Sequence, residues 1–140
     1  MSSLREAQKQ LTRDVIIDRA LELFTEKGYA ATTIDEIAVA AGTTRATFYA
    51  HYPTRADLMR DFMARVNAVL DRADGPDRGT TAAGLVDVVR AGELDGILAW
   101  LESRAVLWPV FRPYLDVLDE AAAVDPEVRA LVRGWHEEVI

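Results

Sequence analysis

The sequence predicts an all-α protein with a helix-turn-helix near its N-terminus. Half of its 140 residues are apolar, no alternating β-branched run occurs, and Ala, Leu, Arg and Glu dominate, as is typical of helical proteins. Residues 33–58 then show two short helices across a glycine turn, followed by the start of a third. We expect an N-terminal three-helix helix-turn-helix domain, joined by a long helix to a second helical domain.

The first predicted helix runs from Arg13 to Lys27. Apolar residues recur along it at helical spacing, which gives the helix one buried face. These residues are Ile16, Ile17, Ala20, Leu23 and Phe24. Gly28 ends the helix, because glycine readily takes the left-handed backbone conformation. Residues 1–10 are polar and should be frayed or a short extension of this helix.

Two shorter helices follow. Thr33 and Glu36 form a T-x-x-E capping box that starts the first of them, and Gly42 ends it after about two turns. Thr43 and Thr44 can cap the next helix, whose Phe48 faces its predecessor. The outer face of that helix is small, polar and basic, with Arg45, Ala46, Thr47, Tyr49 and Ala50.

A long connecting helix comes next. Pro53 disfavours helical geometry at Tyr52, and Thr54 caps a helix that extends to about Ala73. Residues 74–79 contain Gly75-Pro76 and form the best domain boundary. The predicted parts are therefore a helix-turn-helix DNA-binding domain over 1–53, a connecting helix over 54–73 and a further helical domain over 80–140.

The second region should form four helices, over 81–90, 93–106, 110–122 and 126–140. Pro109 interrupts the middle two, and Asp125-Pro126 is an N-cap followed by proline at the first helical position. All three tryptophans lie in this region, and we expect an apolar, aromatic-rich interior. Its members would be Leu94, Ile97, Leu98, Trp100, Leu101, Trp108, Phe111, Tyr114, Leu115, Leu118 and Trp135.

Charge is divided unevenly along the chain. Residues 1–60 hold eight basic and eight acidic residues, so the net charge of −7 belongs to the remainder. Between Ala41 and Arg60, three arginines face one aspartate, a local excess that suits modest phosphate contact. One copy of this unit should therefore bind DNA weakly.

Several function classes are disfavoured. The chain has no Cys, and the H-E-x-x-H pattern that opens at His136 fails at Ile140. With no phosphate-cradling glycine loop and no paired catalytic groups, we expect no enzyme, no metal and no cofactor. The N-terminus carries charges where a secretory signal is apolar, and no apolar run approaches the ~18 residues of a membrane span, so we expect a cytoplasmic protein without membrane contact.

Residues 13–60 resemble the N-terminal DNA-binding unit of the TetR family of bacterial one-component repressors. The positions that carry the resemblance are Ala20, Leu23-Phe24, Gly28-Tyr29, Thr32-Thr33, Ile37-Ala38, Ala41-Gly42, Thr47-Phe48-Tyr49, His51-Tyr52, Arg55 and Leu58. The later helices fit only the family's general plan of a divergent ligand-binding domain.

The resemblance implies a DNA-binding face. It comprises Thr33 and Tyr49 on phosphates, Arg45, Ala46 and Tyr49 in the major groove, and Thr47, His51 and Arg55 on the backbone, with Thr44 at the start of the recognition helix. The chemistry agrees, since arginine can reach a guanine edge, alanine admits a thymine methyl and hydroxyls suit phosphate oxygens. Two alternatives stay open: Tyr49 as a core aromatic and His51 as a simple helix-end residue.

The resemblance also implies a pocket for a small-molecule effector in the second region. Its candidate lining is Trp100, Trp108, Phe111, Tyr114, Leu118 and Trp135. The alternative is that these residues form an ordinary core.

The function that follows is a ligand-responsive repressor. We expect a homodimer on a palindromic double-stranded DNA operator, released by a small, largely apolar effector. Family members usually continue into further helices that form the dimer interface, whereas this chain ends within a predicted helix, so we expect a truncated effector-binding domain. The alternative function is a truncated relative that acts as a protein-interaction module and pairs with another regulator.

Overall fold

The computed structural model describes residues 2–69 and 83–139, and every regular element in these two ranges is a helix. The helices are α1 (Ser2–Lys27), α2 (Ile34–Ala40), α3 (Arg45–His51), α4 (Arg55–Val69), α5 (Ala83–Ala91), α6 (Leu94–Ala105), α7 (Trp108–Val124) and α8 (Pro126–Val139). The all-α prediction is confirmed. The predicted domain boundary at 74–79 and the last residues of the predicted connecting helix lie outside the described residues.

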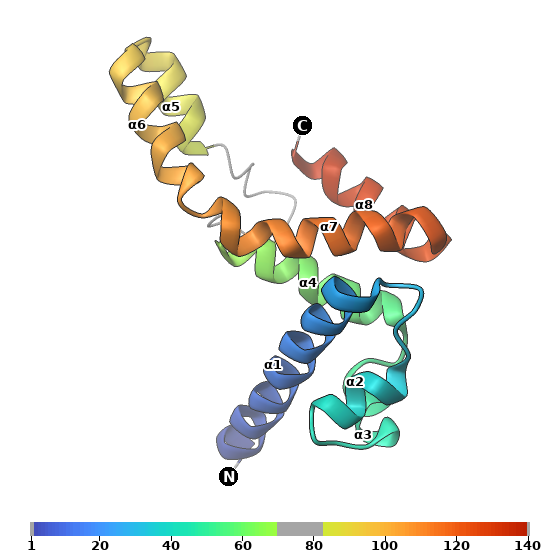
Figure 1. The fold of residues 1–140 in the computed structure, drawn as a ribbon. Coiled ribbons are helices and arrows are strands. Elements are labelled where there is room, and N and C mark those ends of the chain that lie inside the picture. Colours follow the sequence, from blue (N-terminus) through green and yellow to red (C-terminus); the bar gives the residue numbers. More distant parts are fainter. Residues whose placement is uncertain (1, 70–82, 140) are drawn as a thin grey trace.

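Helices α1 to α4 form the N-terminal part of the fold. Helices α2 and α3 lie beside α1, and α4 leads away from them towards the second region (Figure 1). The apolar stripe predicted for α1 is buried, with Ile16 and Ala20 at 0 % exposure and Phe24 at 1 %. The helix begins at Ser2, so residues 2–12 continue α1 as a regular helix.

Local capping explains where several of the helices begin. Thr33 Oγ1 accepts a hydrogen bond from the Glu36 amide at 3.2 Å, as the capping box predicts. Before α4, Thr54 Oγ1 accepts from the Asp57 amide at 3.2 Å while the Asp57 carboxylate accepts from the Thr54 amide at 3.0 Å. Asp125 caps α8 by accepting from the Glu127 amide at 3.0 Å. Each cap satisfies amides that no helical carbonyl can reach.

The second region packs directly on the first. Helix α7 crosses α4 and the C-terminal end of α1, and α8 folds back along α7 (Figure 1). Three aromatic rings continue the core across this junction: the ring centroids of Phe24 and Phe62 are 6.0 Å apart, and those of Phe62 and Tyr114 are 5.4 Å apart. The buried residues of both regions therefore form one continuous core.

The α5–α6 hairpin projects away from the rest of the described fold (Figure 1). No residue of α6 is buried, and Leu94, Leu98 and Leu101 are 68 %, 47 % and 49 % exposed. The expectation that these residues lie in an apolar interior is wrong, because α5 and α6 pair mainly with each other. The interior of the second region comes instead from α7 and α8 packed on α4.

Two prolines shape α7. Pro109 lies in its first turn, where a missing amide costs nothing, and Pro113 lies inside the helix. A break between α6 and α7 is present, but it lies at Val106 and Leu107, and Pro109, predicted from the sequence to interrupt the two helices, belongs to α7. None of the described helices is long and apolar enough to cross a membrane.

Candidate nucleic-acid interface

A left-handed glycine makes the turn between α2 and α3. Gly42 has a φ of +69°. Its amide donates to the Val39 carbonyl at 3.0 Å, and the Thr43 amide donates to the Ala38 carbonyl at 2.9 Å. This pair of bonds is the Schellman motif, which satisfies the last carbonyls of a helix while turning the chain. It fixes the direction in which the chain enters α3.

The first turn of α3 is held by two threonines. Thr44 Oγ1 accepts a hydrogen bond from the Thr47 amide at 3.1 Å, and the two hydroxyl oxygens are also 3.1 Å apart. The predicted N-cap is therefore present. Both hydroxyls lie at the start of α3, where the sequence predicts contact with DNA.

Opposite faces of α3 differ sharply in burial. Phe48 is fully buried, and its ring packs against the rings of Tyr49 and Tyr52 at centroid distances of 5.6 and 5.7 Å. Tyr49 is 37 % exposed, so it is not a core aromatic. Arg45, Ala46 and Ala50 are exposed and Thr47 is half-buried. The helix thus presents a small, polar and basic face to solvent while Phe48 anchors it.

Arg45 lies on one flank of α3, between an acid and an aromatic ring. Its guanidinium is 3.6 Å from the Asp35 carboxylate, with both side chains 63 % exposed, and 5.5 Å from the centre of the Tyr49 ring. Such an exposed pair is weak, so Arg45 can exchange it for another partner. Thr33, Ile34, Asp35, Arg45, Tyr49 and Arg55 together line a surface hollow on this flank.

Arg55 is engaged inside the protein. Its guanidinium donates to the Tyr29 carbonyl at 3.3 Å and to the Thr32 carbonyl at 2.6 Å, and lies 5.2 Å from the centre of the Tyr29 ring. These bonds hold the segment that leads into α2. Arg55 borders the hollow, but its donors close a loop of the protein, and its contact with the DNA backbone stays a prediction.

His51 lies on the opposite flank of α3. Helical geometry of about 100° per residue puts Arg45 and Tyr49 on one side of the outer face, and Thr47 and His51 on the other. The pKa of His51 is lowered below its ordinary value, first by burial and then by the positive charges of Arg13 and Lys9. At neutral pH the imidazole is therefore uncharged.

A polar cluster fixes the end of α3 to α1 and α4. Arg13 lies 5.1 Å above the centre of the Tyr52 ring, and its Nη2 is 3.1 Å from Asp61 Oδ2. The Tyr52 hydroxyl donates to the same carboxylate oxygen at 2.6 Å. Burial, followed by this carboxylate, raises the pKa of Tyr52. The cluster orients α3 without taking part in its outer face.

This N-terminal unit also matches a known family by sequence. Residues 16–62 match the sequence profile of the bacterial regulatory proteins of the tetR family. The matched segment runs from the buried Ile16 of α1 to Phe62 of α4, and therefore contains the whole helix-turn-helix. By this unit, the chain belongs to the tetR family. The predicted resemblance is confirmed.

Curated relatives of this tetR-family chain are transcriptional regulators by name. It is 39 % identical over 61 residues to the HTH-type transcriptional regulator AcrR of Shigella flexneri. This match covers 44 % of this chain and 28 % of that protein. The negative transcriptional regulator IcaR of the biofilm operon icaADBC of Staphylococcus epidermidis is 42 % identical over 48 residues, covering 34 % of this chain and 26 % of that protein.

A third relative extends the similarity further along the chain. The HTH-type transcriptional regulator TcmR of Streptomyces glaucescens is 31 % identical over 104 residues, covering 67 % of this tetR-family chain and 46 % of that protein. The matches thus span less than half the length of each of these three relatives. No solved structure matches the chain significantly.

The six predicted effector-pocket residues of this tetR-family chain lie in different environments. Phe111, Tyr114, Leu118 and Trp135 are buried in the core, at exposures of 8 %, 9 %, 1 % and 9 %, whereas Trp108 is 48 % exposed. Trp100 is half-buried on α6, with the Arg104 guanidinium 5.4 Å from its ring centre. The structure places the first four in the core. The Trp108 ring packs against Phe111 at a centroid distance of 5.2 Å, although the residue is half-exposed, and Trp100 lies on the projecting helix α6.

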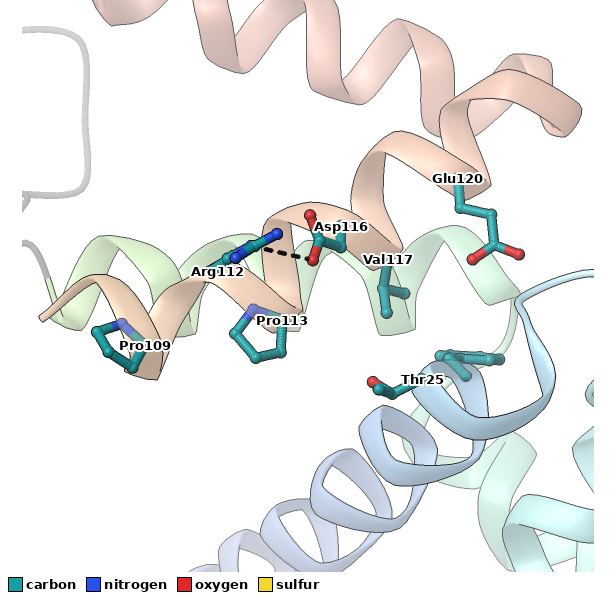
Figure 2. Close-up of a pocket in the computed structure, with 8 residues that line it drawn as sticks. Thr25, Pro109, Arg112, Pro113, Asp116, Val117 and Glu120 are labelled. Atoms are coloured by element: carbon teal, nitrogen blue, oxygen red, sulfur yellow. Dashed lines mark ion pairs between the residues drawn. The ribbon is translucent and has the colours of Figure 1, made fainter.

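A groove of about 430 Å³ lies elsewhere, between the C-terminal end of α1 and one face of α7. Figure 2 shows its lining from α7, with the ion pair of Arg112 and Asp116 on one wall and Pro109 and Pro113 beside it. Phe24 and Thr25 of α1 form the other side. None of the six predicted pocket residues lines it. The groove borders the DNA-binding unit directly.

At one end of this groove, a hydrogen bond joins the two regions directly. Glu120 Oε1 accepts a hydrogen bond from the Tyr29 amide at 2.9 Å, and the Tyr29 hydroxyl donates to Asp125 at 3.3 Å. Since the Tyr29 carbonyl accepts from Arg55, the loop between α1 and α2 is held from both regions.

Sequence reasoning missed three contributors to this interface. Asp35 lies between the two members of the capping box, and its place in the first turn of α2 puts it near Arg45 across the turn. Asp61 and Glu120 gave no sequence signal, because their partners are distant in sequence: Arg13 lies 48 residues from Asp61 and Tyr29 lies 91 residues from Glu120. Among the described residues, no group of three or more His, Cys, Asp or Glu could hold a metal ion.

Proposed function

We propose that this chain is a DNA-binding transcriptional regulator that inserts α3 into the major groove. The outer face of α3 carries the proposal: Arg45, Ala46 and Ala50 are exposed over a fully buried Phe48. A small, polar and basic face of this kind allows close approach to base edges, while hydroxyls beside it suit phosphates. The relatives are regulators by name, and we propose no enzymatic role.

We propose further that the regulator acts as a repressor and as a homodimer. The negative regulator among the relatives supports the sign of regulation. Residues 1–60 have no net charge, so one copy gains little from phosphate attraction, and two copies would bind far more tightly than one. Two copies related by a two-fold axis would read an inverted repeat with half-site centres about 34 Å apart.

Selection from a random pool of DNA duplexes tests this function. We expect an enriched inverted repeat, because a symmetric dimer reads both half-sites alike. Enrichment of a single half-site would contradict the homodimer. A pool in which no motif becomes enriched would contradict sequence-specific DNA binding.

Replacing Arg45 tests whether its side chain contacts a DNA base. Arg45→Ala should cost about 1–3 kcal/mol of binding free energy on the selected operator and relax the preference at one base position. Arg19→Ala is the control, since Arg19 is paired with Glu22 on the exposed surface of α1. An equal loss for Arg45→Ala on selected and random duplexes would assign Arg45 to phosphate and not to a base.

We also propose that a small, largely apolar effector controls this binding from the second region. The continuous core of Phe24, Phe62 and Tyr114 and the bond between Glu120 and Tyr29 offer routes from α7 to the DNA-binding unit. An effector would release DNA only by binding the DNA-free arrangement more tightly. Tryptophan fluorescence tests this, because all three tryptophans lie in the second region. Unchanged fluorescence and unchanged thermal midpoints across a panel of apolar compounds would favour a plain core.

A further inference from the structure

The N-terminal end of α1 extends well beyond the core of the helix-turn-helix. The helix begins at Ser2, whereas its first fully buried residue is Ile16. In Figure 1 this end of α1 runs alongside α2 and α3 and reaches the same end of the molecule. The extension thus reaches the end of the molecule that carries α3.

Helical register places basic side chains on one particular face of this extension. Thr12, Lys9 and Arg5 precede Ile16 by one, two and three turns, and therefore share its face. At Ile16 that face packs into the core of the helix-turn-helix. Further towards the N-terminus the same face carries Lys9 and Arg5, both of which are exposed.

These two charges are available to a partner. Neither Arg5 nor Lys9 forms an ion pair within residues 2–69 and 83–139, whereas Arg13, Arg19 and Arg65 on the same bundle all do. Two unpaired cations on one helix face do not stabilise the fold. Both side chains are therefore available to a partner outside it.

The extension lies on the flank of α3 that the hollow leaves open. The hollow, with Thr33 and Tyr49, occupies one flank. His51 lies on the other, next to Tyr52, whose ring centre is 5.1 Å from the Arg13 guanidinium of α1. A helix in the major groove, which is about 12 Å wide, has a phosphate backbone on each side. Groups on both flanks of α3 therefore face phosphates of different strands.

We propose that Arg5 and Lys9 bind phosphates of the DNA strand on the far side of the groove from Thr33 and Tyr49. The ligand is the phosphodiester backbone of duplex DNA, which two cations attract whatever the base sequence. The inference rests on the proposed function, because it requires α3 to lie in the major groove. It adds a second set of phosphate contacts from a different helix.

The test is the salt dependence of DNA binding by the double variant Arg5→Gln/Lys9→Gln. Each phosphate contact contributes about 0.9 to the slope of log K against log salt, so the variant should lose about 1.8 per bound chain. Between 50 and 200 mM salt, the wild-type chain should then lose about twelvefold more affinity than the variant. The loss of affinity should be the same on selected and random duplexes.

A matched control separates these contacts from net charge. Arg90→Gln/Arg133→Gln removes the same two charges from exposed positions on α5 and α8, and should keep the wild-type slope. Circular dichroism and thermal midpoints should be unchanged in both double variants, since all four side chains are exposed.

The outcomes distinguish a failure of this inference from a failure of the proposed function. If the wild-type chain binds DNA and both double variants keep its slope, Arg5 and Lys9 do not contact phosphate and only this inference fails. If both variants lose slope equally, the effect is one of net charge and the inference fails again. If the wild-type chain binds no duplex at all, the proposed function fails together with it.

Discussion

Arg55 holds the loop before α2 by donating to two carbonyls, those of Tyr29 and Thr32. Arg55→Ala removes both bonds and leaves the Tyr29 carbonyl only the Thr32 amide at 3.4 Å, and should lower the free energy of unfolding by about 1–3 kcal/mol. DNA binding should weaken as well, because Thr33 follows directly after this loop. Chemical denaturation measures the first effect.

Arg45→Ala is the comparison for that experiment, since it removes only an exposed ion pair and should hardly change the free energy of unfolding. Arg55→Lys should recover part of the loss at most, because an ammonium group lacks the planar fork of a guanidinium. Unchanged stability in Arg55→Ala, together with weaker DNA binding at all sequences, would return Arg55 to the phosphate role that the sequence predicts.

We expect His51 to make DNA binding depend on pH. Burial, Arg13 and Lys9 lower its pKa in the free protein, and a phosphate beside it would raise that pKa again. Binding then takes up a proton, so affinity should increase as pH falls through the pKa of the bound state, and level off below that of the free state. Fluorescence anisotropy on one operator between pH 8 and pH 5.5 measures this.

The two histidines of the chain provide the control. His51→Gln should abolish the increase, whereas His136→Gln should retain it. The free energy of unfolding should change with pH in the opposite direction. Because the pKa of His51 is lowered by folding, the unfolded chain binds the proton more readily. The contribution of His51 to stability is therefore full above its ordinary pKa and falls as pH drops through it. A pH dependence that survives His51→Gln would contradict the contact.

At the scale of elements, two left-handed glycines end helices in different surroundings. Gly42 has φ +69° and nothing within 4 Å of a built Cβ, whereas Gly28 has φ +93° and would place its Cβ 2.9 Å from Glu120 Oε1. Gly42→Ala should therefore cost only the left-handed strain, about 1–2 kcal/mol. Gly28→Ala should cost more, because the Glu120 carboxylate must also leave the Tyr29 amide.

A double-mutant cycle checks the reason for this difference. Glu120→Ala should destabilise the wild-type chain but add little to Gly28→Ala, since the bond between Glu120 and Tyr29 is already lost. Fully additive free energies would show that the alanine at position 28 leaves this bond intact.

Element boundaries were largely predictable because their signals are local. Thr33, Thr44, Thr54 and Asp125 each cap a helix through amides two or three residues away, so a short window of sequence contains both partners. Gly42 acts equally locally. The same reasoning located the exposed face of α3, because the position of Phe48 alone decides which side is buried.

What depends on tertiary placement was not predictable from such windows. The apolar residues of α6 have the composition of a core, yet the hairpin projects and leaves them exposed. Arg55 carries the charge expected of a phosphate ligand, but its donors meet carbonyls 23 and 26 residues away. The groove beside α7 depends on how α1 and α7 cross, which no periodicity within either helix records.

At the scale of the whole molecule, the charge division suggests how the chain orients on DNA. Residues 61–140 carry the entire net charge of −7, so phosphate repulsion should keep the second region away from the duplex while the neutral N-terminal unit approaches. A dimer would then contact DNA only through its two helix-turn-helix units.

Stoichiometry is the corresponding prediction. Sedimentation velocity with a labelled inverted repeat should show two chains per duplex at saturation. A duplex with one half-site should bind far more weakly, because it loses the contribution of the second copy. One chain per inverted repeat at saturation would contradict the homodimer and favour pairing with a different regulator.

Finally, α1 is one uninterrupted helix with Thr25 at the groove and Arg5 near its other end. At 1.5 Å per residue these two residues are separated by about 30 Å. A tilt of about 5° at the Thr25 end would therefore displace Arg5 by about 2.6 Å, close to the length of a hydrogen bond. Because α1 is one continuous helix, a slight repacking of its C-terminal end against α7 would shift its N-terminal end far enough to break or form a contact there.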